Sequence, residues 1–152
     1  MSSPSPLPSD SGTSRFLPPA SLARTDVTPQ AGGYELPLVD RAVLQELEEQ
    51  LDGPVVALRF ARDYTDMWEQ RFRRLASALA RQDRAAAMDA VISLKISSAM
   101  VGGLRLAWLA EQLEHLIRRD DYDGGRPVLA DVAEHGGQTV RELRGMYLQV
   151  ND

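Results

Sequence analysis

Apolar side chains between residues 40 and 150 recur at steps of three and four, the spacing of one face of an α-helix. Two such stripes meet at Gly102-Gly103. The first consists of Ala90, Leu94, Ser97 and Val101, and the second of Leu106, Ala110, Leu113 and Ile117. In one straight helix they would lie on roughly opposite sides. We therefore expect one helix to end and the next to begin at the glycines, which tolerate positive φ. The alternative is one long helix that is apolar all round.

The same spacing, with its capping residues, predicts further helices on both sides of this corner. Asp40 is a suitable N-cap for a short first helix, which should end at Asp52-Gly53. Pro54 suits the first turn of a long second helix, and Asp83 is a good N-cap for the third. The predicted helices are 40–51, 54–80, 84–101, 104–118 and 127–150.

The connections between these helices are short, so consecutive helices should be antiparallel neighbours. The expected fold is all-α: an antiparallel up-down four-helix bundle, with the Asp40–Leu51 helix lying across one end. Gly136-Gly137 should interrupt the last helix by a kink or by a close approach of another helix. Asp120–Gly125 is expected to be a loop, and it lacks the ligand spacing of a calcium-binding EF-hand.

Residues 1–38 differ in composition from the rest of the chain, because seven of the nine prolines fall there among Ser, Gly and Thr. Such a segment cannot bury enough apolar surface to fold, so we predict a disordered tail at 1–38 and a helical domain at 39–152. The tail lacks the apolar core of a secretion signal, and no apolar run is long enough to span a membrane. We therefore expect a cytoplasmic protein.

Composition excludes several classes of function. The chain has no cysteine, so disulfides, thiol nucleophiles and Cys metal sites are impossible. A formal net charge of −5 argues against nucleic-acid and anionic-membrane partners. No phosphate-binding loop, nucleophile motif or dinucleotide fingerprint is present, so we predict no enzyme activity, no cofactor and no metal site.

The stretch Leu94–Leu113 resembles the histidine-containing phosphotransfer (HPt) domains of two-component phosphorelays. Lys95 stands at the family's Lys, Ser97-Ser98-Ala99 at its small residues and Gly102 at its second Gly. Trp108 and Glu111 match aromatic and Glu positions of the following helix. The resemblance extends over roughly residues 40–150 and implies the same bundle architecture.

Two positions depart from the family's pattern. Ile92 stands where the phosphorylated His should be, and Ile96 stands at the first Gly. An isoleucine side chain has no nucleophile, proton donor or acceptor, so phosphotransfer at this position is chemically excluded. The resemblance then implies a degenerate member of the family, which binds a partner without carrying phosphate.

The implied docking surface is a further apolar stripe of the third helix, on the side away from Leu94 and Val101. It consists of Ile92, Ile96, Ala99 and Gly103, at steps of four, three and four. Its partner would be a response-regulator receiver domain or a histidine-kinase element. Alternatives are a homodimer through this stripe, cover by the first helix or the tail, and a helical scaffold unrelated to phosphorelays. The predicted partner-binding residues are Ile92, Lys95, Ile96, Ala99, Gly102 and Gly103.

Other charged and titratable residues have simpler interpretations. His115 and His135 lie outside the third helix, so we expect ordinary surface or boundary histidines, with a relocated phosphate carrier as a weaker alternative. The arginines of the second helix are expected to form a solvated face, paired at i,i+4 with Asp63, Asp66 and Glu69, in preference to an anion site. They are Arg59, Arg62, Arg71, Arg73 and Arg74.

Overall fold

The computed structural model describes residues 32–148, and every regular element in that range is helical. The prediction of an all-α protein is therefore confirmed. A short 3-10 helix, η1, precedes the main helices, and a π-helical turn, η2, follows them. The elements are η1 (Gly33–Glu35), α4 (Arg41–Gln50), α5 (Pro54–Asp66), α6 (Trp68–Ala80), α7 (Arg84–Met100), α8 (Leu104–Arg118), α9 (Tyr122–Leu143) and η2 (Arg144–Leu148).

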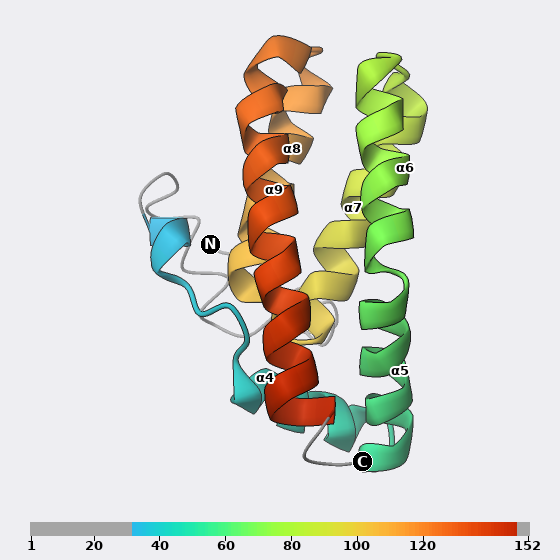
Figure 1. Cartoon of the computed structure of the whole chain (residues 1–152), viewed down its shortest axis with the longest axis vertical. Coiled ribbons are helices and arrows are strands. Elements are labelled where there is room, and N and C mark those ends of the chain that lie inside the picture. The colour runs from blue at the N-terminus through green and yellow to red at the C-terminus, as the bar shows by residue number, and fades with distance from the viewer. Residues whose placement is uncertain (1–31, 149–152) are drawn as a thin grey trace, which may run out of the picture.

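Helices α5 and α6 follow one another in one column along the long axis of the molecule, and α7, α8 and α9 run beside them (Figure 1). Helix α7 packs against α6 and α8, and α9 packs against α8 and α6. Helix α4 lies across one end of the columns, near α5 (Figure 1). The apolar faces meet in one core, whose fully buried members include Leu75, Val91, Leu109, Leu113 and Val132.

Three helix starts follow the capping residues that the sequence indicated. The Asp40 carboxylate accepts a hydrogen bond from the Ala42 amide at 2.9 Å and begins α4. The Asp83 carboxylate accepts one from the Ala86 amide at 3.2 Å and begins α7. Pro54 occupies the first turn of α5, where its missing N–H costs little. These local predictions are confirmed.

The chain turns at Gly102-Gly103, and the alternative of one long helix is wrong. Gly102 has a φ of +82°, which a residue with a side chain rarely adopts. The Asp40 amide donates to the Gly102 carbonyl at 2.8 Å, so the start of α4 is held against the corner. A Cβ atom on Gly102 would lie 2.6 Å from the Asp40 carbonyl oxygen, which leaves room for glycine only.

The predicted helix 54–80 is wrong in one respect, because it is interrupted at Met67, between α5 and α6. The Thr65 hydroxyl donates to the Arg62 carbonyl at 2.9 Å. Such a bond from a side chain to its own helix competes with the backbone ladder and bends helices. Met67 leaves the helical conformation, with φ −97° and ψ 2°. The two halves nevertheless continue in nearly the same direction (Figure 1).

The predicted start of the last helix at Pro127 is also wrong, because α9 begins at Tyr122. The Asp121 carboxylate accepts from the Gly124 amide at 2.8 Å and caps the helix, which shortens the expected loop at 120–125. Gly136-Gly137 does not break the helix. A Cβ on Gly136 would lie 2.0 Å from the Trp68 ring, so the prediction of a close helix approach is confirmed. The expected end at Val150 lies outside the described residues.

The packed part of the chain begins before the predicted domain boundary after residue 38. The Arg105 amide donates to the Pro37 carbonyl at 3.1 Å, and its Nε donates to the Leu36 carbonyl at 2.9 Å. Gly33 lies against the Trp108 ring, and the Tyr34 ring meets Trp108 edge-on at 5.1 Å. Residues 33–38 therefore belong with the helices, because Arg105 and Trp108 bind them. The rest of the predicted tail, 1–31, lies outside the described residues.

Candidate functional site

The outer face of α7 carries an apolar stripe made by Ile92, Ile96, Ala99 and Met100, which we call the α7 stripe. The inner face of the helix already buries Val91 and Leu94 in the core, so the stripe points outward. Ile96 is 53% exposed and Met100 is 37% exposed, while Ile92 and Ala99 are half-buried. Met100 was not among the predicted site residues, although it follows Ile96 by four positions and so shares its face.

Two predicted site residues, Gly102 and Gly103, are buried and do not join this exposed face. Gly102 lies beneath the Asp40 backbone. A Cβ on Gly103 would lie 3.1 Å from the Thr139 side chain and 3.6 Å from the Leu38 carbonyl oxygen. The helical spacing that assigned Gly103 to the stripe fails because α7 ends before it. The glycines instead let α4, α9 and residues 36–40 approach the corner.

Lys95 borders the α7 stripe on the side of α8, where an acidic residue holds it. Its Nζ donates to Glu114 Oε1 at 2.7 Å, and Arg118 Nη2 donates to Glu114 Oε2 at 2.6 Å. The Glu114 side chain is only 4% exposed, so water screens these pairs weakly. Lys95 was predicted to face the same side as the stripe, but its charge is directed to Glu114.

Sequence reasoning did not select Glu114, although the pattern of α8 contained a signal for it. Ala107, Ala110, Glu114 and Ile117 follow at steps of three, four and three, which places one carboxylate in a buried stripe. A buried carboxylate needs a cationic or hydrogen-bonding partner. Lys95 is the only lysine of the chain and lies on the neighbouring helix.

Arg71 of α6 borders the α7 stripe on its opposite side. Its Nη1 donates to Ser93 Oγ at 3.3 Å and to Ser97 Oγ at 3.2 Å. The Ser97 hydroxyl donates to the Ser93 carbonyl at 2.8 Å. The expectation that the arginines of this segment form a solvated face is therefore wrong for Arg71, which is half-buried against α7. It fits Arg73, whose exposed guanidinium lies 4.0 Å from Glu69.

Beneath Arg71, the α5–α7 contact contains a buried hydroxyl pair. Tyr64 Oη and Ser98 Oγ lie 2.6 Å apart, and both residues are buried. Burial raises the pKa of Tyr64 to about 12, although the hydrogen bond with Ser98 and the charge of Arg71 both act to lower it. The phenol is therefore neutral at physiological pH and anchors α5 to α7.

Neither histidine lies on α7. His115 is an exposed residue of α8, with its Nε2 4.0 Å from Glu111 Oε2. His135 is a half-buried residue of α9, whose ring centroid lies 6.0 Å from that of Tyr34. Both therefore lie apart from the α7 stripe in the fold, on other helices.

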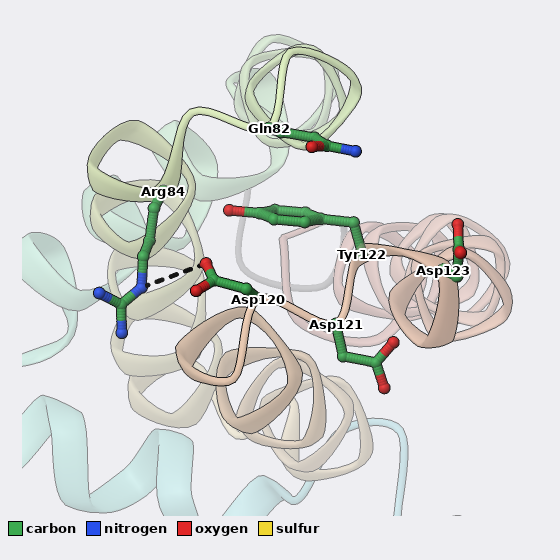
Figure 2. Close-up of a pocket in the computed structure, with 6 residues that line it drawn as sticks. All are labelled: Gln82, Arg84, Asp120, Asp121, Tyr122 and Asp123. Atoms are coloured by element: carbon green, nitrogen blue, oxygen red, sulfur yellow. Dashed lines mark ion pairs between the residues drawn. The ribbon is translucent and has the colours of Figure 1, made fainter.

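The acidic turn before α9 lines a hollow with the start of α7 (Figure 2). Arg84 Nε lies 3.7 Å from Asp120 Oδ1, and Arg84 Nη2 donates to the Arg118 carbonyl at 2.8 Å. Asp121 and Asp123 point away from Arg84 (Figure 2). Within residues 32–148, no three His, Cys, Asp or Glu side chains converge as a metal site would require. Arg84 thus joins two helix ends through Asp120 and Arg118.

The described part of the chain is helical and carries an exposed apolar stripe on α7. The comparison with protein families gives a more specific assignment: residues 59–152 match the model described as Hpt domain. The match includes α6 to α9 and more than half of the chain, so the chain belongs to the Hpt domain family. Comparisons with curated proteins and with solved structures gave no match.

Membership of this family connects the chain with phosphorelay signalling, in which Hpt domains interact with response regulators and histidine kinases. No helix in the described part of the chain is both long and apolar enough to cross a bilayer.

Proposed function

We propose that this chain is a pseudo-phosphotransfer module that binds a receiver domain or a histidine-kinase element without carrying phosphate itself. The observation that carries the proposal is Ile92, a half-buried isoleucine of the α7 stripe at the position that the family resemblance assigns to the phosphorylated His. A module that binds but does not accept phosphate would act as a competitor, a sequestering factor or an adaptor in a phosphorelay.

The chemistry of the α7 stripe supports binding without transfer. Phosphoryl transfer needs a nucleophile in line with the phosphorus, and the stripe offers only hydrocarbon and one thioether. Lys95, the candidate for offsetting phosphate charge, already pairs with Glu114 at 2.7 Å. An exposed apolar stripe bordered by polar groups is typical of protein interfaces, which combine an apolar centre with a polar rim.

The arrangement of the helices supports the finer details of the proposed fold. We assign the four columns (α5 with α6, α7, α8 and α9) to the family's up-down four-helix bundle, and α4 to an extra helix across its end. The folded domain would then begin near Gly33. A cytoplasmic location follows as part of the same proposal, because phosphorelay receivers work there.

Calorimetric titration of the purified protein against the host's receiver domains, with and without a phosphate mimic, tests the proposal. We expect micromolar binding that Ile96→Asp abolishes, because a charge in an apolar contact must be desolvated without a partner. Val55→Asp is the matched control, since Val55 is 66% exposed on α5 and lies outside the stripe. Equal binding by both variants and the wild type would place the docking surface elsewhere.

Phosphate transfer is tested separately, by incubating the protein with a phosphorylated receiver. We expect no acid-labile phosphate on the wild type. Label on the wild type that disappears in His115→Gln or His135→Gln would instead identify a relocated carrier. Ile92→His combined with Ile96→Gly restores the family's two residues, and acceptance of phosphate by this variant would support the assignment of position 92.

A scaffold that self-associates through the α7 stripe is a second candidate, favoured by the same exposure of Ile96 and Met100. Light scattering distinguishes the two functions. A dimer that persists on dilution and is lost in Ile96→Asp, in a protein that binds no receiver, would favour the scaffold. A monomer that binds a receiver would favour the pseudo-phosphotransfer module.

A further inference from the structure

The two borders of the α7 stripe differ in charge compensation. With about 100° between successive residues of a helix, the order around α7 is Lys95, Ala99, Ile92, Ile96, Met100, Ser93 and Ser97. The apolar stripe thus lies between Lys95 on the α8 side and the two serines on the α6 side. Lys95 is paired with the buried carboxylate of Glu114. The cation above the serines is Arg71.

Arg71 is held in place but not neutralised. Its Nη1 is fixed by the hydroxyls of Ser93 and Ser97, and its Nε is buried without a hydrogen-bond partner. Its Nη2 makes no hydrogen bond within residues 32–148 and is not among the buried atoms there, so water reaches it. No carboxylate in that range lies within ion-pair distance of it.

We infer that Arg71, together with the exposed hydroxyl of Ser93, is the anchor for a carboxylate of the partner protein that docks on the α7 stripe. The guanidinium would donate from Nη2 to an Asp or Glu side chain next to the partner's apolar contact. This inference rests on the proposed function and specifies the chemistry of the partner's surface.

Charge complementarity selects a carboxylate as the occupant of this position. Arg71 has an accessible donor and, in the described part of the chain, no carboxylate within ion-pair distance, so no ion pair occupies its charge before an anion binds. The two serine hydroxyls hold the Arg71 guanidinium in one orientation before the partner binds, which lowers the side-chain entropy lost on binding. Lys95 cannot compete with Arg71 for the partner's carboxylate, because its Nζ is already paired with Glu114 Oε1 at 2.7 Å. When the partner covers the α7 stripe, water is excluded from around Arg71, which strengthens the ion pair.

The binding test compares Arg71→Gln with Arg73→Gln, a matched control whose exposed arginine pairs with Glu69 at 4.0 Å on the same helix. Calorimetry against the receiver that binds the wild type should show about tenfold weaker binding for Arg71→Gln and unchanged binding for Arg73→Gln. Raising the salt concentration should weaken wild-type binding and affect Arg71→Gln much less, because the pair that salt screens has been removed. Thermal unfolding of each variant confirms that it folds.

If Ile96→Asp abolishes binding while Arg71→Gln binds as tightly as the wild type, the carboxylate anchor is wrong and the proposed function stands. If the phosphate mimic on the receiver strengthens binding only when Arg71 is present, the anion is a phosphoryl group, and the inference of a carboxylate is overturned.

A second experiment tests the anchor without any receiver. Acetyl-aspartate N-methylamide is added to the full-length protein while the Arg71 Nε–H resonance is followed by NMR, with the uncharged asparagine analogue as control. We expect a saturable shift with the aspartate compound alone. No shift, or equal shifts with both compounds, would overturn the inference. A specific shift in a protein that binds no receiver would keep the anion site and remove the proposed receiver partner.

Discussion

Lys95 and Arg71 are cations on opposite borders of the α7 stripe, and they differ in the groups that pair with them. Lys95 Nζ lies 2.7 Å from a Glu114 side chain that is 4% exposed, and Arg118 completes the group. Arg71 Nη1 contacts only neutral serine hydroxyls, at 3.3 and 3.2 Å. The first arrangement satisfies its charges within the fold, while the second leaves a donor accessible.

Lys95 therefore carries a charge that stabilises the fold, whereas Arg71 carries a charge that is available to bind a partner. Removing a cation that pairs with a buried carboxylate lowers the free energy of unfolding. The Lys95–Glu114–Arg118 group should therefore contribute to stability. A half-buried arginine bonded to hydroxyls contributes little to folding, because water can replace those bonds. Arg71 should therefore affect binding more than stability, and Lys95 the reverse.

The largest effect on stability is expected when Glu114 is removed. Glu114→Ala leaves Lys95 and Arg118 facing each other without their common carboxylate, and it opens a gap in a buried position. We expect the free energy of unfolding to fall by about 3 kcal/mol, measured by urea denaturation. Glu114→Gln fills the same space and keeps one acceptor, its amide oxygen, for Lys95 or Arg118, so it should cost less than Glu114→Ala. A loss below about 0.5 kcal/mol would show that the group is not structural.

Alkaline pH should reveal the buried phenol beneath Arg71. The folded protein holds the pKa of Tyr64 at about 12, above its ordinary value of 10.0, so its contribution to stability is complete below pH 10 and declines as pH rises toward 12. The wild type should lose about 2 kcal/mol more than Tyr64→Phe over this range. Subtracting the variant removes the contributions of Tyr34 and Tyr147, whose pKa values are also raised. Parallel curves would contradict the burial of this hydroxyl.

The smallest effects compare the two cations directly. Lys95→Met should lower the free energy of unfolding by about 1 kcal/mol, because Glu114 keeps only Arg118. Arg71→Gln should lower it by less than about 0.5 kcal/mol, since no carboxylate loses its partner. The measurement is the urea concentration at which each of the two variants is half unfolded. If Arg71→Gln is the more destabilising variant, the distinction between structural and available charge is wrong.

The sequence predicts those features that depend on neighbours along the chain. Asp40 and Asp83 begin helices by accepting a hydrogen bond from an amide two or three residues further along the chain. Pro54 suits a first turn by its fixed φ, and Gly102 permits the corner by its positive φ. For the same reason, the all-helical fold could be read from spacing alone. The family resemblance also came from a contiguous stretch, Leu94–Leu113, and the match over residues 59–152 bears out the family.

The features that the sequence did not predict depend on contacts between helices. Arg71 looks like an ordinary surface charge until α7 is placed beside α6, and the partner of the buried Glu114 is identified only when α7 is placed beside α8. The break at Met67 is an exception, because it lies next to a hydrogen bond within α5, from the Thr65 hydroxyl to the Arg62 carbonyl. Gly103 fits the helical spacing of the stripe, yet the corner removes it from the exposed face.

In the proposed function, the α7 stripe docks a phosphorelay partner without accepting its phosphate. The first experiment is calorimetric titration of the host's receiver domains with the wild type and with Ile96→Asp. We expect micromolar binding by the wild type and no detectable binding by Ile96→Asp, with Val55→Asp unchanged. If the folded, helical wild-type protein binds no receiver, the proposed docking to receivers is wrong.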